Sequence, residues 1–83
     1  MNNGQHSYHF FVGDKRYETD QPSLTGAQIK AMAGAESGDG LLLEGHGNHP
    51  DEVIEDGQVV DLHPGEGGVK RFRLEPAATF GAQ

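Results

Sequence analysis

A single helix start, set between short runs of strand-forming residues, is the feature that most limits how these 83 residues can fold. Thr25 and Gln28 have the spacing of a capping box, in which each side chain satisfies a main-chain N–H of the first helical turn. Leu24 and Ile29 have the spacing of a hydrophobic staple across the same start. Gly34 is well placed to end the helix after about two turns. The chain is therefore predicted to contain one short helix.

Side chains on this helix are expected to divide between a buried and an exposed side. Ile29, Met32 and Ala33 fall on one stripe, which predicts that they face the core. Lys30 lies on the other side, near the negative end of the helix dipole.

Short apolar runs outside the helix are typical of strands. They lie at residues 7–12, 15–19, 41–44 and 69–74, with a minimal run at 53–54. The connection at 13–14 contains glycine, which suits a tight antiparallel hairpin between the first two runs. Residues 59–62 are expected to supply core side chains from irregular backbone.

Alternation along the first two runs predicts which side chains enter the core. Tyr8, Phe10 and Val12 are expected to point inward. Tyr17 of the second run should join them. Phe11 would then point outward, either covered by a loop or by the tail of the chain, or exposed as a contact residue for a partner.

The predicted order of elements is compatible with few folds in so short a chain. That order is strand, strand, helix, strand, minor strand, strand. The helix must cover one face of a mixed sheet of about four or five strands. This order fits an α+β fold of the β-grasp type, in which the first and last strands are central and parallel. The domain is expected to span residues 7–75, between a disordered N-terminus at 1–6 and a flexible C-terminal tail at 76–83.

Composition argues against several classes of protein. Six Lys and Arg against 13 Asp and Glu give a net charge of −7, which argues against nucleic acid or an anionic membrane as the main partner. Cysteine is absent, so disulfides and Cys-based zinc sites are excluded. No apolar run is long enough to cross a bilayer, and the amino end lacks the order of a secretory signal. We therefore expect a cytoplasmic protein whose partners are other proteins.

No catalytic site, metal site or cofactor is predicted. His46 and His49 have ligand-like spacing, and His6 and His9 repeat it, but a metal centre needs three or four converging ligands. No serine stands in a nucleophile motif with an evident base. The histidines are therefore interpreted as surface or loop residues, and the domain is not expected to be an enzyme.

Several short motifs stand in a defined order between residues 7 and 76. They occupy residues 8–12, 25–29, 33–34, 42–45, 60–62 and 70–72. In order and spacing they resemble the bacterial multiubiquitin-domain proteins. The resemblance implies a ubiquitin-like modifier, encoded beside homologues of ubiquitin-activating and ubiquitin-conjugating enzymes and a peptidase in operons linked to defence against phage. Those enzymes, the processing or deconjugating peptidase and the target proteins would be its partners.

The predicted tail would carry the reacting group of such a modifier, a C-terminal carboxylate that partner enzymes activate and transfer to an amine. Gly81 is the only glycine in the tail, and glycine lets the main chain enter a narrow catalytic channel. Ala82 and Gln83 follow it where ubiquitin has a terminal di-glycine. Either a peptidase removes both residues to free the carboxylate of Gly81, which we favour, or the end at Gln83 is used directly.

Phe80 is the one large aromatic residue in this tail, and it could anchor the tail in a pocket of a partner. The alternative is that the whole segment is an ordinary frayed terminus.

Charge is unevenly distributed along the chain. None of the six basic residues, but nine of the 13 acidic ones, lie in residues 31–69. Arg71 and Arg73 on the last predicted strand, with Lys15 or Arg16 on a nearby strand, would form a basic strip near the exit of the tail. The strip could steer docking onto an acidic partner face, or be a solvated strand face whose arginine stems cover apolar surface. The side-chain amines, which are the possible acceptors if the protein forms chains on itself, are Lys15, Lys30 and Lys70.

Two other functions are compatible with the same fold. A non-covalent adaptor would use the domain as a protein-binding module, with the tail idle or bound to a partner. A sulfur carrier fits less well, because a bare terminal Gly-Gly would be expected.

Overall fold

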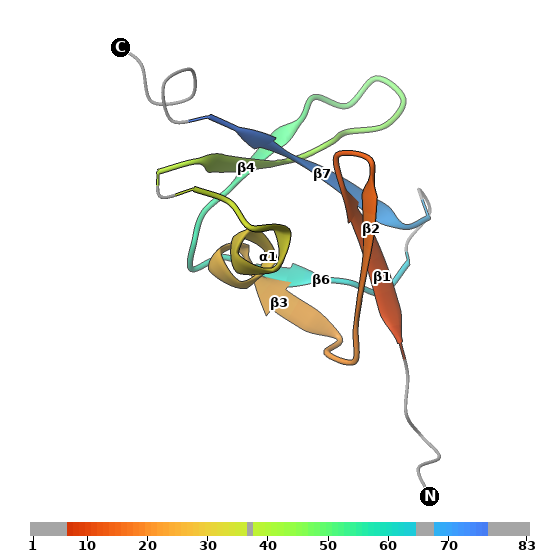
Figure 1. The fold of residues 1–83 in the computed structure, drawn as a ribbon. Helices are drawn as coiled ribbons and strands as arrows, with labels where there is room; N and C mark the ends of the chain where they lie inside the picture. Colours follow the sequence, from red (N-terminus) through yellow and green to blue (C-terminus); the bar gives the residue numbers. More distant parts are fainter. Residues whose placement is uncertain (1–6, 37, 65–67, 77–83) are drawn as a thin grey trace, which may run out of the picture.

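The computed structural model describes residues 7–36, 38–64 and 68–76. Within these ranges, seven strands and one helix follow one another (Figure 1). They are β1 (Tyr8–Val12), β2 (Lys15–Thr19), β3 (Ser23–Thr25), α1 (Gly26–Ala33), β4 (Gly40–Leu43), β5 (Glu52–Ile54), β6 (Val59–Asp61) and β7 (Lys70–Glu75).

Five of the strands form one mixed sheet in the order β2-β1-β7-β4-β5. β1 and β7 run parallel, and the other neighbours are antiparallel. In Figure 1 the sheet curves around α1, with the β3–β6 pair beneath the helix. This arrangement confirms the predicted α+β fold of the β-grasp type, with the first and last strands adjacent and parallel.

The core lies between the sheet, the helix and the β3–β6 pair. Its buried side chains are Phe10, Val12, Leu24, Ile29, Leu41, Ile54, Val60, Leu62 and Phe72. The rings of Phe10 and Phe72 meet edge to face, with centroids 5.9 Å apart, and Tyr17 stacks on Phe10 at 5.6 Å. Tyr8 and Tyr17 are half-buried against this cluster, so the predicted inward side of the hairpin is confirmed.

The helix begins and ends as the sequence predicts. The Thr25 hydroxyl accepts the Gln28 N–H at 3.2 Å, and the Gln28 side chain accepts the Thr25 N–H at 2.8 Å, which completes the capping box. Gly34 ends the helix with a positive φ of 73°. Ile29 is fully buried and Ala33 half-buried, but Met32 is 39% exposed, so its predicted burial is wrong. With 3.6 residues per turn, Ala33 lies about 40° and Met32 about 60° from Ile29, in opposite directions, and the core lies on the side of Ala33.

Two short strands were not expected. Residues 59–62 were predicted to be irregular, yet β6 pairs antiparallel with β3, so that Leu24 stands opposite Val60. Each strand has three residues and buries one side chain, Leu24 or Val60, so neither shows an alternation long enough to recognise. None of the helices in the described part of the chain is long and apolar enough to cross a membrane.

Candidate docking site on the sheet

One face of the sheet lies away from the helix and carries the predicted contact residues of β1 and β7. Phe11 stands opposite Arg16 of β2 on one side and Arg71 of β7 on the other. Directly opposed residues share a face, so these three side chains form a row, which we call the Phe11 row. Lys15 stands opposite Val12 and therefore takes the other face.

Phe11 is half-buried, and a guanidinium group covers its ring. The Arg71 Cζ atom lies 4.4 Å from the ring centroid, a cation–π contact. The Arg71 guanidinium thus packs over the outward face of this aromatic side chain. The Phe11 row therefore combines apolar area with positive charge in one place.

Among the described residues, no carboxylate pairs with either arginine of the Phe11 row. Arg16 contacts the His9 ring, with Nη2 3.0 Å from Nδ1, and Arg71 is exposed above Phe11. Within residues 7–36, 38–64 and 68–76, the ion pairs involve Lys30, His63 and Arg73. In a chain of net charge −7, the Phe11 row thus keeps two positive charges available to an acidic partner.

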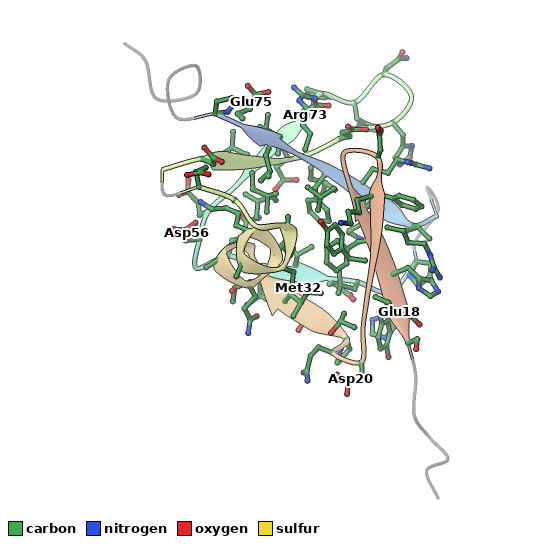
Figure 2. The ribbon with its side chains drawn as sticks, viewed as in Figure 1. Glu18, Asp20, Met32, Asp56, Arg73 and Glu75 are labelled. Atoms are coloured by element: carbon green, nitrogen blue, oxygen red, sulfur yellow. The ribbon has the colours of Figure 1, made fainter. Side chains whose placement is uncertain are left out.

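Arg73 lies on the same face, but its charge is compensated. Its Nε donates to Glu75 at 3.1 Å; both side chains are labelled in Figure 2. Its Nη1 donates to Asp51 in the loop between β4 and β5. Bonds to Glu75 and Asp51 raise the pKa of Arg73. The pKa of Asp51 is lowered, first by the N–H of Gly45 and then by Arg73. Arg73 therefore joins the loop to β7, and Arg71 and Arg16 carry the accessible charge of the predicted strip.

Two apolar side chains extend this face beyond the Phe11 row. Leu42 of β4 stands opposite Arg73 and also opposite Val53 of β5. Leu42 is half-buried and Val53 is 47% exposed. Sequence reasoning did not assign them to a site, although alternation along β4, with Leu41 in the core, places Leu42 on the opposite face.

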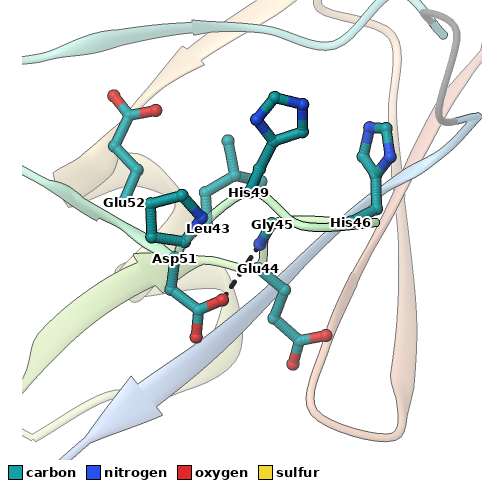
Figure 3. A pocket seen from close by; sticks show the side chains of 8 residues that line it. Leu43, Glu44, Gly45, His46, His49, Asp51 and Glu52 are labelled. Carbon is teal, nitrogen blue, oxygen red and sulfur yellow. Dashed lines mark hydrogen bonds between the residues drawn. The ribbon is translucent and has the colours of Figure 1, made fainter.

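A shallow hollow of about 500 Å³ lies beside the end of β4 (Figure 3). It is lined by Leu43, Glu44, Gly45, His46, His49, Pro50, Asp51 and Glu52. The Gly45 N–H donates to Asp51 at 3.0 Å and closes the base of the loop. The rings of His46 and His49 lie 5.9 Å apart, but the described residues include no group of three or more His, Cys, Asp or Glu that could hold a metal.

The remaining predicted site residues are those of the C-terminal tail and the three lysines named as possible acceptors. Phe80, Gly81, Ala82 and Gln83 are outside the described residues, and β7 ends at Glu75, just before the exposed Pro76. Lys15 is exposed and Lys70 is half-buried. Lys30 is 18% exposed, and its Nζ donates to the Asp39 carbonyl at 2.7 Å and to Asp56 at 2.8 Å. Lys15 is thus the most accessible of the three amines.

A helix packed on a five-stranded mixed sheet, with β1 parallel to β7 at its centre, is the arrangement of a β-grasp domain. The family model for Multiubiquitin matches residues 8–73, and the chain belongs to that family. This confirms the resemblance found in the sequence. Domains of this ubiquitin-like family are generally non-catalytic. The same comparisons found no matching curated protein and no matching solved structure.

Proposed function

We propose that this ubiquitin-like domain is a protein modifier, activated at a C-terminal glycine and joined to target proteins in a bacterial ubiquitination-like pathway. The observation that carries the proposal is family membership over residues 8–73. Members resemble modifiers whose activating, conjugating and peptidase partners are encoded nearby, in operons linked to defence against phage. In this proposal a peptidase cleaves after Gly81, and the carboxylate it frees is adenylated and transferred.

The placement of the Phe11 row supports such a use of the tail. Arg71 and Glu75 belong to one strand, so the row lies about 13 Å from the end of β7. Gly81 follows Glu75 by six residues, which an extended chain spans in at most about 22 Å. An enzyme that docks on the Phe11 row would therefore have its catalytic centre within about 35 Å of Arg71 if it acts on Gly81.

The chemistry of the row indicates the kind of surface that would bind there. Arg16 and Arg71 would bind carboxylates of a partner. Phe11, with Leu42 and Val53 beside the row, would pack against apolar side chains of the partner. We propose an acidic face with an apolar centre on the activating or conjugating enzyme. Charge of this kind acts mainly on the association rate and on orientation.

Co-expression with the enzymes encoded next to the gene tests the proposal. Mass spectrometry should detect covalent adducts on cellular proteins, and these should vanish when residues 77–83 are deleted. A non-covalent adaptor, favoured by the same exposed face, would instead leave the mass of the chain unchanged while a stable complex forms. That second outcome would reject the modifier and retain the docking site.

A further inference from the structure

Within the described residues, β2 is an open edge of the main sheet, with a strand on one side only (Figure 1). Lys15, Arg16 and Glu18 on this strand are exposed. In the part of the chain that the structure describes, no main-chain hydrogen bond from a loop reaches Arg16 or Glu18. A further strand therefore has access to this edge.

The hairpin turn decides which main-chain groups of β2 face outward. Val12 and Lys15 stand opposite each other across the turn at 13–14, and the pair that closes such a turn is hydrogen-bonded across the hairpin. Pairs then alternate along an antiparallel ladder. The odd-numbered residues of β2 thus direct their N–H and C=O groups toward β1. The even-numbered residues, Arg16 and Glu18, direct theirs toward the open edge.

The sequence of β2 is complementary to its own antiparallel copy. When Tyr17 stands opposite Tyr17 of a second copy, each Arg16 stands opposite a Glu18. These are the outward-directed residues, so each of the two opposed pairs combines two main-chain hydrogen bonds with opposite charges. A register centred on Arg16 or on Glu18 would oppose a charge to itself, which is destabilising. Charge therefore selects one register.

We propose that β2 pairs with β2 of a second copy of this chain, in an antiparallel two-fold register centred on Tyr17, and so joins two five-stranded sheets into one. Charged residues on an edge ordinarily discourage strand pairing, but in this isologous contact the charges match. The net charge of −7 on each copy opposes association. We expect a dimer that forms between micromolar and millimolar concentration, without any residue of the tail and without any enzyme.

A charge-swap experiment, read by sedimentation velocity and native mass spectrometry over a concentration series, tests the register. Arg16→Glu alone opposes glutamates, and Glu18→Arg alone opposes arginines, so each should weaken dimerisation about tenfold or more. An equimolar mixture of the two variants should form a heterodimer, because both opposed pairs are then of opposite charge. The double variant, which keeps the wild-type net charge, should dimerise like the wild type.

Amide hydrogen exchange measured by NMR gives a second, independent readout. As the protein concentration rises, the N–H groups of Arg16 and Glu18 should become protected, while that of Tyr17, already directed toward β1, should change little. A monomer at every concentration would overturn the proposal, and so would an association that neither the single variants nor their mixture alters. These measurements use the purified chain without any enzyme. A result that excludes the dimer would therefore not bear on the proposed conjugation function.

Discussion

At the scale of single residues, the start of the helix leaves no room for a side chain at Gly26. Gly26 is buried, and a Cβ there would overlap the carbonyl of Glu55 and lie 3.1 Å from Ile54 Cγ2. The Gly26 N–H donates to the Gln58 carbonyl at 3.0 Å, and the Ala27 N–H donates to that of Asp56 at 3.0 Å. The turn after β5 thus caps the helix, and a side chain at Gly26 would push it away.

Gly26→Ala is therefore expected to destabilise the fold by about 1–3 kcal/mol, the usual range for overpacking. Gly57→Ala is the matched control, because nothing lies within 4 Å of a Cβ at that position. Urea unfolding of the two variants measures the difference. Equal midpoints would mean that the turn after β5 does not pack on the helix as described.

Ile29 and Met32 provide a second matched pair on the helix. Ile29 is fully buried and Met32 is 39% exposed. Ile29→Ala should cost about 2–4 kcal/mol, since a buried cavity is created, whereas Met32→Ala should cost less than about 1 kcal/mol. Thermal and urea unfolding would report this. A larger loss at Met32 than at Ile29 would contradict the observed orientation of the helix.

At the scale of elements, the sequence was most informative where several signals coincided. The capping box, staple and terminal glycine of α1 act through residues three to five apart, and the β1–β2 hairpin is equally local, so both were predictable. The β3–β6 pair and the link from Arg73 to Asp51 join residues 22 or more positions apart. Nothing local in the sequence encodes such pairings, so they were missed. The proposed docking face includes Phe11 and Arg71, which the sequence predicted, and Leu42, which it did not, because the run of leucines hides the alternation.

Because Asp51 links the β4–β5 loop to β7, we expect the free energy of unfolding to depend on pH at acidic values. The pKa of Asp51 is lowered by the Gly45 N–H and Arg73, and the pKa of Asp61 by the N–H and ring of His63. Each carboxylate binds its proton less tightly in the folded than in the unfolded chain. The stabilisation is therefore present above the unfolded pKa, about 4, and is lost as the pH falls through the lower folded pKa.

Melting temperature measured against pH should accordingly fall below about pH 4. Asp51→Asn should lower stability at neutral pH and make that fall shallower. Asp14→Asn, in the exposed hairpin turn, removes the same charge and serves as the control. If the melting temperature of Asp51→Asn fell with pH as steeply as that of the wild type, other contacts would hold the loop.

At the scale of the whole molecule, the fold brings Arg16, Phe11 and Arg71 together in one basic, partly apolar row that ends on β7, the strand that leads to the tail. If the Phe11 row guides docking, Arg71→Glu should slow association with the activating enzyme about tenfold at low ionic strength, and the difference should shrink as salt is added. Ala31→Glu, on the exposed helix, adds negative charge away from the face and should change the rate little. Stopped-flow or surface-based kinetics would measure both rates.

In the proposed function, Gly81 supplies the reacting carboxylate. The most direct test incubates the purified chain with its activating and conjugating enzymes, the peptidase and ATP, and maps the linkage by tandem mass spectrometry. We expect the carbonyl of Gly81 to be joined to a target amine, and we expect Gly81→Val to prevent this transfer without changing thermal unfolding. A linkage through Gln83, or an unmodified chain held in a stable complex, would show that Gly81 is not the reacting residue.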